Sequence, residues 1–312
     1  MQYINFEDIQ NLNIAPKTCV KWVYEALLKK YECILPAKIS MKLPDDVFIN
    51  TMPVCIPDIQ RFGVKIVSRY PKRTPALQSD LMLYDINSGE SLALMDGLWI
   101  TTMRTGAVAA LSIKYLRKST ARKYAFIGLG NTARATLLCL LSLEGSGPIE
   151  VNLLRYKNQA EQFVNRFKQY DNVVFKIYDS CTELIQESDV IVSCVTVANE
   201  LFAPDNAFKE GVLVVPVHTR GFQNCDLFFD KIYADDQEHV RGFKYFNKFK
   251  QFDEFSHILL GQNIGRESDT ERILAYNIGI ALHDIFFASK IYEMVSSAPR
   301  LNSGLKEEKY WV

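Results

Sequence analysis

A short apolar run that breaks at two glycines and resumes as a helix constrains the fold of this chain most strongly. Residues 123–127 read Lys-Tyr-Ala-Phe-Ile, which is typical of a buried strand, and Gly128 and Gly130 follow directly. From Asn131 onward, apolar residues recur at helical spacing. A strand, a glycine turn and a helix in this order are the context of a dinucleotide-binding fingerprint, here G-x-G-x-x-A with Ala133 last. The alternative is a plain turn between a strand and a helix.

Each residue of the motif has a physical task in the first interpretation. Gly128 permits the tight turn, Gly130 lets the backbone approach a pyrophosphate, and Ala133 allows helix and strand to pack closely. The helix begins at Asn131 and Thr132, where free backbone N–H groups and the positive end of the helix dipole favour phosphate. These five residues are therefore predicted to contact the cofactor.

Strand and helix patterns alternate between residue 120 and residue 235, which predicts a parallel sheet with helices on both faces. Strands are expected at 123–127, 149–154, 173–178, 189–194, 212–217 and 231–234, and helices at 131–143, 158–169, 181–187 and 204–209. The fold class is therefore α/β, with a Rossmann-type doubly wound sheet.

The two ends of the chain show a different pattern. Residues 6–31 are expected to be helical, short extended runs with a hairpin near 81–95 follow, and helical spacing returns at 102–116. A long amphipathic helix is expected at 274–292. These parts predict a second, α+β domain.

Composition and charge narrow the range of functions. Lys plus Arg and Asp plus Glu both number 36, so the net charge is zero and neither nucleic acid nor an anionic membrane is expected as a partner. The seven cysteines are scattered without a C-x-x-C pair, which predicts reduced thiols in a cytoplasmic protein and no metal site. Neither a signal peptide nor a membrane-spanning segment is expected.

Several segments, taken together, resemble the ornithine cyclodeaminase/mu-crystallin family. They are residues 63–68, 94–97, 100–107 with Met-Arg-Thr-Gly-Ala, 127–133, 233–238, 265–268 with Gly-Arg-Glu-Ser, and 279–284. The resemblance implies a Rossmann domain at 120–272 that binds NAD(P), and a second domain from 1–119 and 273–312 that binds substrate and forms a homodimer. It also implies hydride transfer at the Cα of an amino or imino acid.

Three basic residues of the N-terminal part are candidates for the substrate site. An amino-acid carboxylate needs a charge-assisted and preferably bidentate partner, and Arg104 follows an apolar hairpin at the opening of a helix. The resemblance puts Arg104 and Lys65 on the carboxylate site, with Lys38 where the family usually has Arg. Lys65 is also expected to exchange a proton with the imine. The alternatives are a buried ion pair for Arg104 and a solvated surface position for Lys65 and Lys38.

Cofactor choice depends on the end of the second predicted strand. An acidic residue there would hold the ribose hydroxyls of NAD, but the chain reads Arg155, Tyr156 and Lys157. These cations favour the 2′-phosphate of NADP(H), with NAD(H) as the alternative; Arg155 could instead stack on the adenine or face solvent.

Two further segments are expected near the cofactor. Val195 and Thr196 follow the strand that ends near Cys194, and they should form the next cofactor-facing loop. The resemblance places Asn277 and Gly279 against the nicotinamide ring.

The strand expected at 212–217 leads into a departure from the family. Cyclodeaminases of the family carry Gly-Gly-Asp here, whereas this chain has Val217, His218 and Thr219. This weakens the prediction of ornithine cyclodeamination. His218, at the carboxyl end of a parallel strand, is a candidate acid/base together with Thr219, and a structural histidine bonded to the backbone is the alternative.

The sequence therefore predicts an NAD(P)-dependent oxidoreductase, either an imino-acid reductase or an amino-acid dehydrogenase. A cyclodeaminase with tightly bound NAD and a synthase that joins two amino acids are the enzyme alternatives. A protein that binds NADPH or a small ligand without catalysis, like a crystallin, is the alternative from another class.

Overall fold

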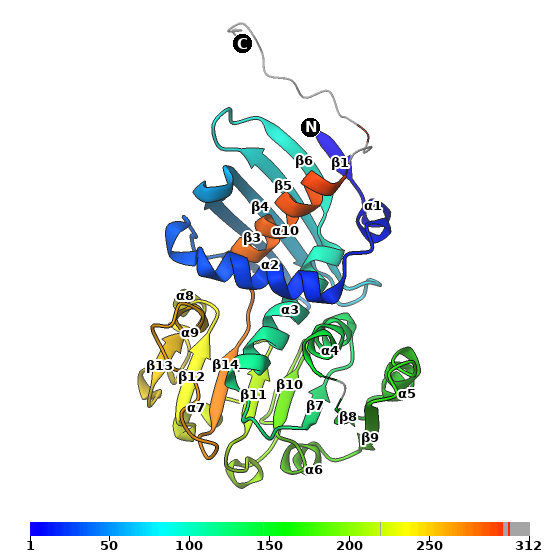
Figure 1. The fold of residues 1–312 in the computed structure, drawn as a ribbon, viewed down its shortest axis with the longest axis vertical. Helices are drawn as coiled ribbons and strands as arrows, with labels where there is room; N and C mark the ends of the chain where they lie inside the picture. The colour runs from blue at the N-terminus through cyan, green and yellow to red at the C-terminus, as the bar shows by residue number, and fades with distance from the viewer. Residues whose placement is uncertain (146, 219, 296–298, 300–312) are drawn as a thin grey trace, which may run out of the picture. The chain divides into compact units, whose positions relative to one another are not determined.

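The computed structural model describes residues 1–145, 147–218, 220–295 and 299 (Figure 1). The chain divides into two compact units. The first unit holds Met1–Ala15, Glu25–Arg104 and the segment from Ile280, and the second holds Pro16–Tyr24 and Thr105–Gly279. This division differs from the expected boundaries at 119/120 and 272/273, because residues 16–24, 105–119 and 273–279 group with the second unit.

The first unit is built on a six-stranded sheet in the order β1-β6-β5-β4-β3-β2 (Figure 1). Its strands are β1 (Gln2–Ile4), β2 (Ile39–Leu43), β3 (Val47–Ile56), β4 (Arg61–Arg69), β5 (Leu77–Asp85) and β6 (Ser91–Asp96). Neighbours are antiparallel except β1 and β6, which are parallel. The expected hairpin is the β5–β6 pair.

Helix α10 (Ala281–Met294) packs against β3, β4 and β5 in the first unit (Figure 1). Gly63 of β4 allows this approach, because a Cβ there would lie 2.6 Å from Cδ1 of Ile285. The helix expected at 274–292 was wrong in its first part: Ile273–Tyr276 form a strand of the second unit, and the helix begins only at Ala281.

The other helical elements of the N-terminal part follow the expected helical regions. Helix α1 (Phe6–Asn11) starts with a capping box in which Asn5 and Asp8 exchange side-chain and backbone hydrogen bonds. Helices α2 (Pro16–Leu28) and α3 (Leu98–Leu116) each contribute residues to both units. Two short 3₁₀ turns, η1 (Lys30–Glu32) and η2 (Pro57–Ile59), complete the set.

The sheet of the first unit has two unlike faces because side chains alternate along each strand. Lys65 and its cross-strand neighbours Met52 and Leu81 are buried. On the opposite face, Ile66 aligns with Thr51, which aligns with Ile39 of β2. Ile66 and Ile39 are 47% and 62% exposed, so this second face presents apolar side chains to the surface of the chain.

The second unit contains an eight-stranded, entirely parallel sheet in the order β13-β12-β14-β11-β10-β7-β8-β9. Its strands are β7 (Lys123–Ile127), β8 (Ile149–Leu154), β9 (Val173–Tyr178), β10 (Val190–Ser193), β11 (Leu213–Pro216), β12 (Lys231–Ala234), β13 (Phe252–Glu254) and β14 (Ile273–Tyr276). The strands from β10 to β12 and β14 are buried along their whole length, as expected when helices cover both faces. This confirms the predicted α/β class.

Short helices connect these strands (Figure 1). They are α4 (Asn131–Leu143), α5 (Gln159–Arg166), α6 (Cys181–Gln186), α7 (Cys225–Phe228), α8 (Gln237–Val240) and α9 (Phe255–Leu259), with 3₁₀ turns η3 (Asp205–Ala207) and η4 (Phe246–Lys248). Strands β8 and β9 extend the sheet on one side of β7, and β10 and β11 extend it on the other side. This reversal of strand order is the topological switch point at which ligands bind in open parallel sheets.

Candidate functional site

The glycine turn between β7 and α4 has the geometry that a phosphate site needs. Gly128 has φ +81°, and a Cβ there would lie 2.8 Å from the backbone nitrogen of Val195. Gly130 is the N-cap of α4, without a side-chain cap, and a Cβ there would meet no heavy atom of the described residues within 4 Å. The first N–H groups of α4, at Asn131, Thr132 and Ala133, lack an acceptor within the helix, so the start of this helix is suited to an anion.

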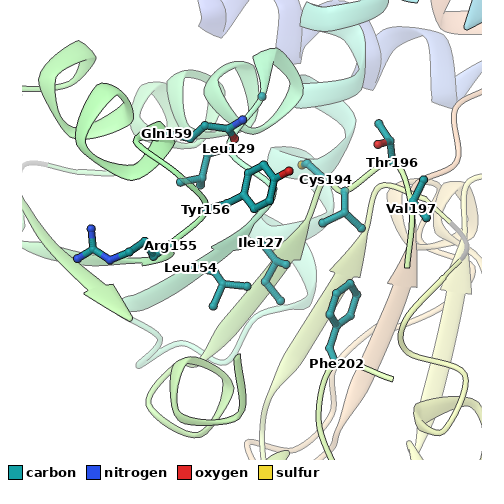
Figure 2. Close-up of a pocket in the computed structure, with 13 residues that line it drawn as sticks. Ile127, Leu129, Leu154, Arg155, Tyr156, Gln159, Cys194, Thr196, Val197 and Phe202 are labelled. Atoms are coloured by element: carbon teal, nitrogen blue, oxygen red, sulfur yellow. The ribbon is translucent and has the colours of Figure 1, made fainter. Parts of the chain in front are cut away.

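A cavity of about 480 Å³ opens beside this turn, at the carboxyl ends of β7, β8 and β10 (Figure 2). Its lining includes six of the predicted cofactor residues: Gly128, Gly130, Arg155, Tyr156, Val195 and Thr196. Sequence reasoning missed Gln159 and Phe202, which also line it. Gln159 lies in the first turn of α5, and no motif marks either residue. The cavity size and its mainly apolar walls suit a nucleotide.

Arg155 is held by two carboxylates that the sequence analysis did not anticipate. Its Nε donates to Oδ1 of Asp179 at 2.8 Å, and its Nη1 contacts Glu161. Figure 2 shows the side chain extending away from Cys194 and Thr196. Lys157 adopts φ +52°, with its ammonium 5.3 Å from the ring centre of Tyr156. The charge of Arg155 is therefore already partnered within the protein.

His218 lies just beyond β11 and is fixed at both ring nitrogens. Nδ1 accepts the backbone N–H of Arg220 at 3.1 Å, so Nε2 carries the proton and donates to Oγ of Ser193 at 2.7 Å. Burial, aided by the charge of Arg220, lowers the pKa of His218 to about 4. A neutral ring with both nitrogens engaged fits the structural alternative better than an acid/base role. Thr219 lies outside the described residues.

Asn277 and Gly279 follow β14 and are held by the second unit itself. The side chain of Asn277 accepts from Oγ of Ser112 at 3.0 Å and donates to the carbonyl of Ala275. Gly279 has φ +92°, and its N–H donates to the buried carboxylate of Asp235. These bonds fix the conformation of the segment after β14.

The first unit contains a buried cluster of charges, formed by Lys65, Arg104 and Asp284. Asp284 of α10 accepts from Nε of Arg104 at 2.8 Å through Oδ1, and its Oδ2 lies 2.5 Å from Nζ of Lys65. Lys65 and Asp284 are fully buried, and Arg104 is 4% exposed. Nη1 of Arg104 is buried and has no hydrogen-bond partner among the described residues. That donor is suited to a ligand carboxylate.

The electrostatics of this cluster act most strongly on Lys65. Burial, together with the charge of Arg104, lowers the pKa of Lys65 to about 7, although the charge and the hydrogen bond of Asp284 act in the opposite direction. The charge of Lys38 also lowers the pKa of Lys65, so Lys38 lies within electrostatic reach. The structure thus brings Lys65 and Arg104 together around Asp284, and Lys38 acts on Lys65 through its charge. Sequence reasoning missed Asp284, although a lone carboxylate amid the apolar residues of α10 is a signal that a buried cation faces it.

The described residues contain no group of three His, Cys, Asp or Glu side chains that could hold a metal ion. Nor, within those same ranges, is any helix long and apolar enough to cross a bilayer.

A parallel sheet with a glycine turn at its switch point defines a nucleotide-binding type of α/β protein, here joined in one chain to an α+β unit with a buried cationic cluster. The chain belongs to the ornithine cyclodeaminase/mu-crystallin family, whose sequence model matches residues 5–298. The resemblance stated from the sequence is thereby confirmed over nearly the whole chain.

Known proteins similar to this chain include two curated relatives and one solved structure. The nodulation efficiency protein NfeD of Rhizobium meliloti is 27% identical over 270 residues, 83% of each chain. A Δ¹-pyrroline-2-carboxylate reductase of Bacillus cereus is 26% identical over 268 residues, 78% of this chain and 80% of the relative. The structure of Thermococcus litoralis Δ¹-pyrroline-2-carboxylate reductase with NADH and L-proline has a TM-score of 0.84 at 24% identity, covering 94% of this chain and 97% of that one. The fold is therefore shared with an NADH-binding reductase.

Proposed function

We propose that this protein is an NAD(P)-dependent oxidoreductase that transfers hydride between a nicotinamide cofactor and the Cα of an amino or imino acid. The buried Lys65–Arg104–Asp284 cluster carries this proposal, because it offers an unused guanidinium nitrogen to a small carboxylate. Family membership and the reductase names among similar proteins support the same class of reaction. Among imino acids, a cyclic imine with an adjacent carboxylate is the preferred substrate class.

The cationic residues divide the work on such a substrate. Arg104 binds the carboxylate with charge-assisted hydrogen bonds, and Lys38 and Lys65 add positive charge beside it. Lys65 gives a proton to the imine nitrogen during reduction and takes it back during oxidation. A buried lysine whose pKa is near 7 supplies both protonation states at neutral pH, which this task needs.

The second unit fits a dinucleotide on structural grounds. The open space at Gly130, the uncapped start of α4 and the adjacent cavity accept a pyrophosphate and its flanking sugars. When bound, the cofactor supplies or accepts the hydride. Arg155 and Lys157 favour NADP(H), whereas Asp179 and Glu161, which already hold Arg155, disfavour a 2′-phosphate. NADP(H) is therefore the preferred cofactor. NAD(H) is the alternative, and the contacts of Asp179 and Glu161 with Arg155 support that alternative.

We further propose a homodimer that assembles through the apolar face of the first unit, and a cytoplasmic location. The face opposite α10 exposes Ile39, Met41 and Ile66 by 62%, 48% and 47%. Exposed apolar area of this kind is typical of an interface. All seven cysteines are free, as in a reducing compartment.

Among the alternatives, cyclodeamination has the least support from the site. Val217, His218 and Thr219 stand in place of the family's Gly-Gly-Asp segment, and His218 is a neutral ring engaged at both nitrogens. A synthase that joins two amino acids and a protein that only binds NADPH share the same cavity, and activity separates them.

The test follows the absorbance of NADPH and of NADH with a panel of cyclic imino acids, and with α-keto acids plus amines. Steady consumption with one of these substrates, lost in Arg104→Met, is the expected result. Cofactor binding without consumption would contradict the proposal, and an ammonia assay with ornithine would then distinguish a cyclodeaminase from a pure binder. The ratio of rates with the two cofactors decides the preference.

A further inference from the structure

Asp284 is the carboxylate that opposes the effects of burial, Arg104 and Lys38 on Lys65. Its side chain is fully buried, and its two oxygens are divided between two cations from different elements. Oδ1 accepts from Arg104 of α3, and Oδ2 faces Lys65 of β4. The cross-strand neighbours of Lys65, Met52 and Leu81, are apolar, so no other strand residue beside it offsets the charges.

We propose that Asp284 is a positioning residue for catalysis: it turns Arg104 toward the substrate carboxylate and holds the Lys65 ammonium in place for proton transfer. This inference rests on the proposed function and deepens it. Asp284 binds Arg104 through Nε, which leaves Nη1 buried and without a protein partner. A guanidinium fixed at one edge presents its remaining donors in a set direction, because the group is planar and rigid.

The balance of charge explains why the site needs one carboxylate and accepts a second. Lys38, Lys65 and Arg104 bring three positive charges, and Asp284 brings one negative charge. Without Asp284, the neighbouring cations and burial would drive the proton from Lys65. With Asp284 in place, positive charge remains in excess, and the carboxylate of the substrate reduces that excess on binding. The site therefore favours a substrate that carries a carboxylate.

A purely structural ion pair that ties α10 to the sheet would use the same contacts. The two roles differ in their consequences. Loss of Asp284 moves the titration of Lys65 in either role, because the carboxylate lies 2.5 Å from its ammonium. Only a positioning role also raises the KM for substrate in the folded protein while the KM for cofactor stays constant.

The experiment uses Asp284→Asn, which keeps the shape of the side chain and removes its charge. Asp226→Asn is the matched control, because Asp226 is also buried but accepts from the hydroxyl of Tyr276 instead of a cation. The titration of Lys65 is followed in the full-length protein by NMR of ¹³C-labelled lysine, with the signal assigned by its loss in Lys65→Met. The KM values for imino acid and cofactor are measured in parallel.

In Asp284→Asn we expect the Lys65 midpoint to fall by about one pH unit or more, and the KM for imino acid to rise roughly tenfold. Asp226→Asn should change neither. An unchanged midpoint, or an unchanged KM for imino acid, in folded Asp284→Asn would overturn the inference. If that variant does not fold, Asp284→Glu keeps the charge but displaces it; there the KM for imino acid should rise, and an unchanged KM would overturn the inference equally.

The NMR titration requires no turnover. A wild-type protein that lacks reductase activity would therefore refute the proposed function without removing the test of Asp284.

Discussion

At the scale of single residues, the proposed mechanism depends most on Lys65. A fully buried lysine is costly unless its charge is compensated, and here one carboxylate serves two cations. Such an arrangement adds little to stability, because desolvation of the charges offsets their attraction. Its persistence in a buried place is better explained by function, since perturbed lysines are suited to proton transfer.

Replacement of Lys65 should reduce turnover. Lys65→Met retains the volume of the side chain but removes the proton donor, so turnover should fall roughly 100-fold or more. The Kd of the reduced cofactor, measured by its fluorescence, should stay unchanged. Normal turnover in this variant would exclude Lys65 from the mechanism.

The shifted pKa of Lys65 should also make the free energy of unfolding depend on pH. The pKa of Lys65 is about 7 in the folded protein and 10.5 in the unfolded chain. Between these values the unfolded chain binds more protons, so the free energy of unfolding should rise with pH from about 7 to 10.5. Urea denaturation at several pH values should show a weaker rise in Lys65→Met than in the wild-type protein. Parallel curves would mean that Lys65 titrates normally.

At the scale of elements, β7, the glycine turn and α4 form the part that the dinucleotide requires. The two glycines serve different purposes, although they are only two residues apart. Gly128 is required by the fold, because of its positive φ and the nearby backbone of Val195. Gly130 has open space around it, so its missing side chain matters only once a ligand approaches.

A matched pair of alanine substitutions separates these purposes. Gly128→Ala should lower the free energy of unfolding by about 1–3 kcal/mol or more. Gly130→Ala should leave stability nearly unchanged and weaken NADH and NADPH binding by roughly tenfold, or about 1.4 kcal/mol. Thermal denaturation and fluorescence titration measure the two effects. Equal cofactor affinity in Gly130→Ala and wild type would contradict the assignment of the pyrophosphate site.

The elements also show what could be predicted from the sequence. Strands β7, β8, β9 and β12 were predicted with their observed limits, because each is a short, mostly apolar run. Strand β14 was missed because its apolar run merges with the apolar start of α10, and only its pairing with β11 and β12 distinguishes it.

The candidate site was predictable only in part, for a similar reason. Lys65 and Arg104 stand in patterned segments, whereas Asp284 joins them from 180 residues beyond Arg104. Asp179, one partner of Arg155, likewise lies 24 residues away, whereas the other partner, Glu161, is only six residues from Arg155. Local patterns do not encode such long-range pairs.

At the scale of the whole molecule, a single chain does not account for the exposed apolar face of the first unit. Ile39, Met41 and Ile66 lie on the side of the sheet away from α10 and are largely exposed. A second copy of the chain that covers this face would bury them.

The dimer is tested by placing a charge on this face. Ile66→Asp should yield a particle of half the mass in light scattering, because burial of an unpaired carboxylate opposes association. Val174→Asp, at a 53% exposed position on β9 of the other unit, is the control and should leave the mass unchanged. A wild-type protein that is monomeric at micromolar concentration would refute the dimer.

The proposed hydride transfer is tested most directly by following where the hydride goes. Reduced cofactor in which both hydrogens at C4 of the nicotinamide are deuterium is incubated with the protein and a cyclic imino acid, and the product is examined by mass spectrometry and NMR. The account predicts an amino acid with one deuterium at Cα and an equal amount of oxidised cofactor. A product without deuterium, or ammonia released with no net change in the cofactor, would contradict it.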